Sequence, residues 1–281
     1  MNGTHLVVDF LLAMAMVPLG LYYGRALAIK GLRLGGSIDM RSARLLFALI
    51  LTFVFSNLSL LMSRSYPAFS WYLPVAVEYY ATPGLMLLNI ASLAFVSSAA
   101  SALAFQTKSS KRWLLPLVCV GLFAVVEYKF RTSALMAEPT IGQEKIGDGG
   151  VVLQTGAATC GAAACASAAR LLGLQKTELE MVRLLGTTEA GTSPAQIVYA
   201  MRELGFVCSK RTISDADVSR VKPPAILFVA VGNEIDGHAV ALARVQDGPA
   251  EIWDPRYGLT RYTVESLKQH WGGRAIEISK Q

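Results

Sequence analysis

The chain has 281 residues, of which 53% are hydrophobic and only 16% are charged, and its net charge is +6. About 25% of residues are charged in a typical soluble globular protein, so this composition excludes an ordinary soluble chain. Residues 1–150 hold 12 Lys and Arg against 7 Asp and Glu, whereas residues 151–281 hold 14 against 13. The basic excess therefore indicates membrane topology rather than nucleic-acid binding, because no arginine-rich tract with interleaved aromatic residues is present.

Apolar runs in residues 1–131 predict a transmembrane region of four helices, since a helix needs roughly 20 apolar residues to cross a bilayer. The predicted spans cover about residues 6–23, 45–62, 83–105 and 114–128. The first run lacks a basic segment before it and a small-residue cleavage site after it, so we interpret it as a retained span rather than a signal peptide. The lipid bilayer is thus one expected partner.

The orientation of this region follows from its loops. Lys and Arg are concentrated after the first and third spans, whereas the loop between spans two and three contains only Arg64. The positive-inside rule then places both termini outside. Residues 63–81 are rich in Trp and Tyr and are expected at the membrane–water interface; a fifth span there would reverse the orientation. The predicted location is a bacterial inner membrane, with the second half of the chain periplasmic or extracellular.

Residues 132–150 are expected to form a linker, because they show no hydrophobic periodicity and end in Gly147–Asp148–Gly149–Gly150. The residues that follow, 151–281, form a second domain. Expected helices cover residues 160–172, 176–185, 193–204 and 264–270. Expected strands cover residues 207–213, 225–231, 238–245, 252–254, 259–263 and 275–278, with a turn at 233–237. Helices followed by an antiparallel sheet define an α+β fold.

The thiol of Cys160 is the leading candidate for a nucleophile. Cys160 stands six residues after Gln154 and opens an alanine-rich helix. A helix N-terminus favours thiolate, which is the nucleophile in cysteine-dependent acyl transfer. The Gln154 amide and the Cys160 backbone N–H are candidates to stabilise an oxyanion.

Two further residues extend this site. His238 opens one predicted strand and Asp254 ends the next, so a hairpin can bring the two side chains together. An imidazole that is oriented by a carboxylate and faces a thiol is the Cys–His–Asp arrangement. Each residue also has a structural interpretation: a core cysteine, a strand histidine, and an aspartate that starts a turn before Pro255. Their joint order favours catalysis.

The other cysteines are expected to pack in the interior. Cys119 lies in an apolar run, Cys165 lies within the predicted helix, and Cys208 lies on a predicted strand. No C-x-x-C pair is present, which argues against a zinc ribbon or a thioredoxin-like site. The site as a whole implies neither a metal nor an organic cofactor.

These motifs resemble the C39 peptidases, which are papain-like bacteriocin-processing or double-glycine peptidases. The resemblance lies in Gln154 with Cys160–Gly161–Ala162–Ala163, in Gly237–His238–Ala239–Val240, and in Trp253–Asp254–Pro255, and it extends over about residues 151–277. It implies a cysteine endopeptidase that cleaves peptide or protein precursors after small residues, often Gly–Gly. An export or assembly system is the partner that it implies. Thr159 departs from the pattern, because many members carry Asp or Tyr at this position.

Two other functions, and self-cleavage, are also compatible with the sequence. A C39-like domain can bind a peptide without cleaving it, and the same triad can serve an acyltransferase. The Gly149–Gly150 pair raises a hypothesis of self-cleavage, although a flexible tether is the simpler interpretation.

Overall fold

The computed structural model describes residues 15–23, 25–26, 71–79, 91, 94–95, 98–99, 138–231, 234–245 and 249–281, without the side chains of residues 231 and 234–236. The chain divides into two compact units, Met1–Arg131 and Thr132–Gln281.

The first unit is described only in part. The predicted spans 45–62 and 114–128 lie outside the described residues, as does Cys119, and the spans 6–23 and 83–105 are described only in pieces. The described pieces include helical residues at 15–23. Within the described parts of the chain, no helix has both the length and the apolar character needed to cross a membrane.

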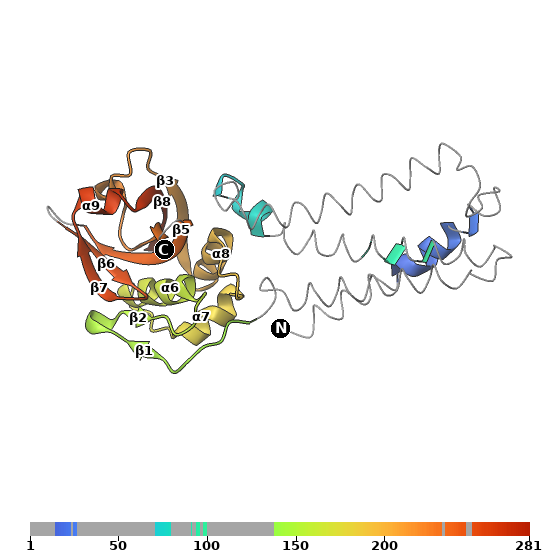
Figure 1. Cartoon of the computed structure of the whole chain (residues 1–281), viewed down its shortest axis with the longest axis horizontal. Helices are drawn as coiled ribbons and strands as arrows, with labels where there is room; N and C mark the ends of the chain where they lie inside the picture. Colours follow the sequence, from blue (N-terminus) through green and yellow to red (C-terminus); the bar gives the residue numbers. More distant parts are fainter. Residues whose placement is uncertain are drawn as a thin grey trace. The chain divides into compact units, whose positions relative to one another are not determined.

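The second unit is an α+β domain, as the sequence predicts. Its helices are α6 (Cys160–Leu171), α7 (Glu178–Leu185), α8 (Pro194–Glu203) and α9 (Val264–Lys268), with 3₁₀ turns η1 (Asp148–Gly150) and η2 (Val218–Arg220). Its strands are β1 (Lys145–Ile146), β2 (Val152–Leu153), β3 (Phe206–Thr212), β4 (Ala225–Val231), β5 (Glu234–Arg244), β6 (Ala250–Asp254), β7 (Gly258–Tyr262) and β8 (Trp271–Lys280). Figure 1 shows α6, α7 and α8 grouped beside the strands, with α9 apart from them.

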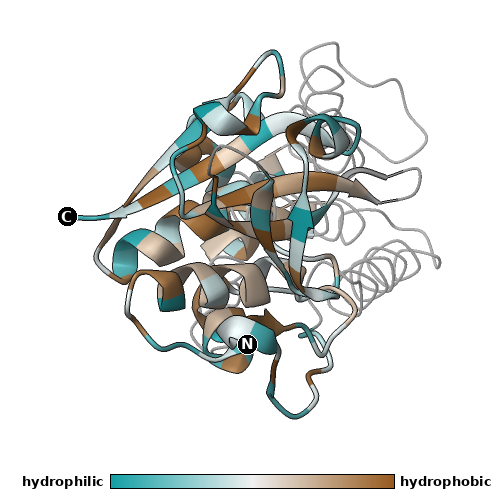
Figure 2. Cartoon of the chain, turned by 90° about the vertical axis from the view of Figure 1, so that its left-hand side faces the viewer, coloured by the Kyte–Doolittle hydropathy of each residue, from teal (hydrophilic) through white to brown (hydrophobic). Residues whose placement is uncertain are grey.

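Six strands form one antiparallel sheet in the order β3-β8-β4-β5-β6-β7. Strand β4 lies in the interior of this order and is covered on both faces. Leu227 belongs to a core cluster that also contains Leu267 of α9 and Val218 of η2, while its neighbours Ile226 and Phe228 are buried as well. Figure 2 shows hydrophobic residues concentrated along these central strands. This double burial explains the unbroken apolar run that predicts a strand over residues 225–231.

Helix α6 is the centre of the helical layer, and it packs against β2, β4, β5, β6, α7 and α8. Small residues make this possible, since alanine and glycine side chains let neighbouring backbones approach closely. Buried residues run without interruption from Gly161 to Ala169. The helix ends as predicted at Gly173, whose φ is 85°, and the next N–H, that of Leu174, donates to the carbonyl of Ala169 at 2.9 Å.

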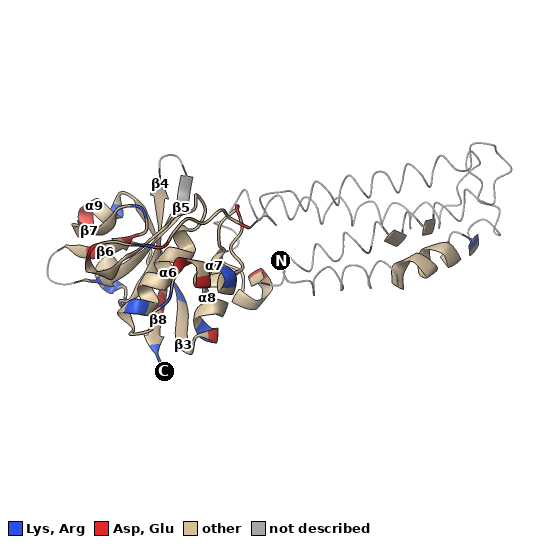
Figure 3. Cartoon of the chain, turned by 90° about the horizontal axis from the view of Figure 1, so that it is seen from below, with Lys and Arg blue, Asp and Glu red and all other residues tan. Residues whose placement is uncertain are grey.

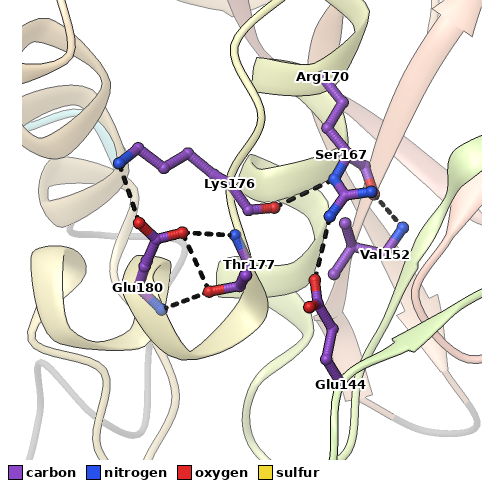
Figure 4. A network of polar contacts seen from close by, with 7 residues as sticks. All are labelled: Glu144, Val152, Ser167, Arg170, Lys176, Thr177 and Glu180. Atoms are coloured by element: carbon purple, nitrogen blue, oxygen red, sulfur yellow. Dashed lines mark hydrogen bonds and ion pairs between the residues drawn. The ribbon is translucent and has the colours of Figure 1, made fainter.

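Capping boxes begin the next two helices. In α8, Ser193 and Gln196 exchange hydrogen bonds, which confirms the predicted helix start. In α7, Thr177 and Glu180 make the same exchange, and Lys176 pairs with Glu180 at 3.2 Å (Figure 4). Both signs of charge occur on the helices and strands of this domain (Figure 3).

The last residues of the predicted linker belong to the fold. Strand β1 pairs with β2 as an antiparallel hairpin, and η1 makes the turn between them. Gly149 and Gly150 adopt φ values of 71° and 91° in this turn, and the Gly150 N–H donates to the carbonyl of Gly147 at 3.2 Å. The pair is therefore a conformational requirement of a tight turn rather than a flexible tether, and cleavage there would require the hairpin to open.

The predicted turn at residues 233–237 is wrong in extent. Strand β5 already begins at Glu234, and it continues the hairpin with β4 through an irregularity between Val229 and Val231. A bulge lets a strand pass through turn-forming residue types without ending. As a result His238 lies within β5 rather than at its first position.

Candidate active site

Three elements bring the predicted catalytic residues together. Cys160 is the first residue of α6, His238 lies on β5, and Asp254 is the last residue of β6. Strands β5 and β6 are paired neighbours, with Ala241 opposite Trp253, and α6 packs against β5. The hairpin expected from the sequence therefore forms, and the helix that carries the thiol lies against it.

The imidazole of His238 is held by the carboxylate of Asp254. Nε2 of His238 lies 2.9 Å from Oδ1 of Asp254, and the two residues are only 2% and 5% exposed. The same carboxylate oxygen accepts the backbone N–H of Arg256 at 2.7 Å. Asp254 thus both starts a turn and orients the histidine, so the structural and the catalytic interpretations of this residue are compatible.

The thiol of Cys160 interacts with the same imidazole. Because Asp254 occupies Nε2, Nδ1 is the ring nitrogen left for the thiol, and it has no hydrogen-bond partner among the described residues. Burial by itself raises the pKa of Cys160, but hydrogen bonds from His238 and from the N–H groups of Ala239 and Gly161 outweigh it and lower this pKa below 9.0.

The histidine shifts in the complementary direction. Burial alone lowers the pKa of His238, but hydrogen bonds with Asp254 and Cys160 raise it from 6.5 to about 9. Burial raises the pKa of Asp254, whereas its bonds with His238 and the Arg256 N–H bring it below 3.8. These shifts favour a thiolate next to an imidazolium, which is the reactive form of a Cys–His pair.

Gln154 lies next to the Asp254 turn. Its backbone N–H donates to the carbonyl of Pro255 at 2.8 Å. Its side-chain Nε2 donates to the carbonyl of Gly156 at 2.9 Å. An amide NH₂ group has two hydrogens, so one bond orients the amide and leaves a second N–H for another acceptor.

The sequence reasoning missed a buried carboxylate behind this loop. Glu178, the first residue of α7, is only 1% exposed. It accepts hydrogen bonds from the backbone N–H of Thr155 at 2.8 Å, from the hydroxyl of Thr155 at 2.7 Å, and from the hydroxyl of Thr159. In the sequence Glu178 is a first-turn acid, which normally lies in solvent, so no local signal distinguishes it.

The remaining cysteines of this domain are interior residues, as predicted. Cys165 and Cys208 are buried. Burial raises the pKa of Cys165 far above that of a free thiol and raises the pKa of Cys208 to about 11. Only Cys160 combines partial exposure with a lowered pKa among the described cysteines.

An α+β domain in which a helix begins with a cysteine, next to a histidine–aspartate pair on an antiparallel sheet, is the arrangement of papain-like cysteine peptidases. Residues 148–281 match the model of the family described as Peptidase C39 family. Residues 148–281 are therefore a C39 peptidase domain, and the protein is a cysteine peptidase.

Other proteins are similar to about half of this chain. Uncharacterized proteins of Methanothermobacter marburgensis and Methanothermobacter thermautotrophicus are 27% and 25% identical over 136 and 135 residues, which is 48% of this chain and 92% of each relative. A double glycine motif protease from an AMS/PCAT transporter, solved in complex with the leader peptide, is 16% identical with a TM-score of 0.42, over 52% of this chain and 97% of that one. The peptidase domain of Streptococcus ComA, a bi-functional ABC transporter, is 26% identical with a TM-score of 0.41, over 46% of this chain and 96% of that one.

Proposed function

We propose that this protein is a membrane-anchored endopeptidase that cleaves peptide or protein precursors after small residues, including Gly–Gly, by a Cys–His–Asp mechanism. The observation that carries the proposal is the buried 2.9 Å contact between His238 and Asp254 beside the Cys160 thiol. A buried imidazole needs its polar atoms satisfied, and among the described residues Nε2 is satisfied by a carboxylate whose pKa is lowered. The preference for small residues is what the resemblance to C39 peptidases implies, and residues 148–281 match the model of that family.

The first chemical step is the formation of an acyl-enzyme. The Cys160 thiolate attacks the carbonyl carbon of the scissile peptide bond, and the carbonyl π electrons move to its oxygen. The free N–H of the Gln154 amide and the backbone N–H of Cys160 stabilise this oxyanion. When the tetrahedral intermediate collapses, the C–N bond breaks and the His238 imidazolium donates its proton to the leaving amine.

The second step releases the other product. His238, now neutral, takes a proton from water, whose oxygen attacks the thioester carbon. Collapse of this second intermediate breaks the C–S bond, and Cys160 leaves as thiolate beside the reprotonated imidazole. Throughout the cycle Asp254 holds Nε2, so Nδ1 stays directed at the sulfur and the substrate.

Cleavage by the full-length protein in detergent, assayed on a peptide library that includes Gly–Gly sequences, tests this function. We expect cleavage by wild type and by Cys165→Ala, and none by Cys160→Ala or His238→Ala. Cys165 is the matched control, because it is a cysteine of the same helix with no role in the proposed chemistry. Equal binding of peptides by wild type and Cys160→Ala without cleavage would instead support a binding module, and ligation without hydrolysis would support an acyltransferase.

The location of the domain is a separate part of the proposal. We propose that residues 1–131 anchor the protein in a bacterial membrane and that the peptidase domain works outside it, next to an export or assembly partner. The apolar runs and the distribution of Lys and Arg in these residues support this orientation. Added protease should digest residues 132–281 in intact, outer-membrane-permeabilised cells; full protection of that segment would place the domain on the cytoplasmic side.

A further inference from the structure

The buried carboxylate of Glu178 is satisfied by neutral donors. Among the residues that the structure describes, Glu178 makes no ion pair, and its three donors are the N–H and hydroxyl of Thr155 and the hydroxyl of Thr159. A buried carboxylate is costly to desolvate unless hydrogen bonds satisfy it. All of these bonds go to one segment, the loop between Gln154 and Cys160.

Thr159 directs its hydroxyl away from its own helix. It is the N-cap residue of α6, a position where a threonine oxygen usually accepts an N–H of the first turn, yet it makes no such bond. Its single hydroxyl proton has two acceptors in reach, the carbonyl of Gly156 at 3.0 Å and the closer Oε1 of Glu178. The carboxylate oxygen is the closer acceptor, so the proton belongs to the bond with Glu178.

The direction of the Thr159 hydroxyl proton determines the other hydrogen bonds of this network. With its proton directed at Glu178, the Thr159 oxygen presents a lone pair to the N–H of Gly156, which lies 3.2 Å away. The carbonyl of Gly156 in turn accepts from the side-chain amide of Gln154. Gly156 itself has no room for a side chain, because an added Cβ would lie 2.5 Å from the carbonyl oxygen of Thr140. Gly156, whose N–H and C=O link Thr159 to Gln154, is therefore closely packed against the residue-140 backbone.

The geometry assigns Glu178 and Thr159 to the positioning of the Gln154 amide, and so of the oxyanion donor, through Gly156. This assignment rests on the proposed peptidase function. Neither residue touches the substrate, so each is a positioning residue. Because a transition-state hydrogen bond depends steeply on placement, we expect the loss to appear in kcat rather than in KM.

The first test uses Thr159→Val, which replaces the hydroxyl by a methyl group of similar size and leaves Glu178 bonded to Thr155. We expect a fall in kcat of about 10-fold with KM changed by less than about 2-fold, since loss of a whole oxyanion donor costs about 100-fold or more. Thr159→Ser, which keeps the hydroxyl, should recover most of this loss. A purely structural role of the hydroxyl would lower the melting temperature without this split between kcat and KM.

The second test changes the carboxylate itself. Glu178→Gln keeps one acceptor oxygen for Thr155 and Thr159 and is expected to retain more activity than Glu178→Met, which keeps none. Glu180→Met is the matched control, because it makes the same change two residues further along α7, in the exposed capping box of Figure 4. Equal losses in the two methionine variants would overturn the assignment.

A double-mutant cycle decides whether the path runs through Gln154. We expect Gln154→Ala to lower kcat by about 100-fold and Thr159→Val to add nothing in that background, because the amide that it positions is gone. An undiminished 10-fold loss in the Gln154→Ala background would overturn the inference. The rate at which iodoacetamide alkylates Cys160 should stay unchanged in Thr159→Val, since the thiol and His238 lie outside this path; a slower rate at every pH would also contradict it.

Failure of the proposed function would be visible separately, as wild-type protein that cleaves no peptide. In that case the double-mutant cycle of Thr159→Val and Gln154→Ala is measured as the affinity of each variant for a peptide aldehyde ending in Gly–Gly. The Cys160 sulfur adds to the aldehyde carbon, and the oxygen of the hemithioacetal needs the same amide donor. Thr159→Val should weaken this affinity about 10-fold in the wild-type background only; equal weakening with and without Gln154 would overturn the inference.

Discussion

Asp254 and Glu178 are two buried carboxylates of one domain, and they differ in what satisfies them. Asp254 faces an imidazole whose pKa rises to about 9, so the contact is an ion pair across neutral pH. Glu178 faces only a backbone N–H and two threonine hydroxyls. The Asp254 carboxylate stabilises a neighbouring cation, whereas Glu178 holds neutral groups in place. We therefore expect substitutions of the two residues to separate in their pH dependence.

Removal of the nucleophile gives the baseline for this comparison. Cys160→Ala should lower kcat/KM by about 10⁴-fold or more, because no other described thiol has the lowered pKa or the exposure of Cys160. Peptide cleavage with wild type and Cys165→Ala as controls measures this. Residual turnover above one part in about a thousand would mean that another group supplies the nucleophile.

Asp254→Asn should lower kcat/KM by about 10²- to 10⁴-fold. The amide can still bind the Arg256 N–H, but it no longer stabilises the imidazolium, so the pKa of His238 falls and that of Cys160 rises. The pH profile of iodoacetamide alkylation should shift toward higher pH. Glu178→Gln is the paired control, and a profile that moves equally in both variants would remove the distinction between the two carboxylates.

Glu178→Leu should lower the free energy of unfolding by about 3 kcal/mol, since it leaves the N–H of Thr155 and the hydroxyl of Thr159 buried without their acceptor. Urea unfolding of the full-length protein, followed by the fluorescence of its tryptophans, measures the change. Glu180→Leu, on the exposed side of the same helix turn, should cost clearly less. A cost for Glu178→Leu no greater than for Glu180→Leu would show that the buried hydrogen bonds contribute little net stability.

Activity should fall about 10-fold per pH unit above pH 9, because His238 then loses the proton that it donates to the leaving amine. The stability contribution has the same sign. A histidine whose pKa is raised on folding contributes fully below its unfolded value of about 6.5, and this contribution is lost as the pH rises through about 9. The pH dependence of the cleavage rate and of the free energy of unfolding, measured for wild type and Asp254→Asn, checks both statements. If the loss of activity at high pH begins at the same pH in both proteins, the ion pair is contradicted.

The smallest effect concerns the cysteines that take no part in the site. Brief treatment of the native protein with iodoacetamide at pH 7 should modify Cys160 and leave Cys165 and Cys208 unmodified, because burial raises the pKa of both. Mass spectrometry of the digested protein reports each position. Modification of Cys165 at a rate similar to Cys160 would show that α6 opens readily.

The sequence by itself determined most of the second domain. The apolar run at residues 225–231, the capping box at Ser193 and the small residues of α6 each have a local cause, and each element lies where it is expected. The proximity of His238 and Asp254 could also be predicted, because a hairpin between neighbouring strands leaves few alternatives. The spans of residues 1–131 stay predictions.

Only the tertiary structure decided which polar residues are buried and which residues they contact. Glu178 has the local pattern of a solvated first-turn acid, and Thr159 that of an N-cap, yet packing of α7 against α6 joins them to each other. In the same way Gly149–Gly150 becomes a hairpin turn once β1 pairs with β2. Periodicity and capping depend on residues a few positions apart, whereas the burial of a charge depends on contacts between segments that the chain order does not specify.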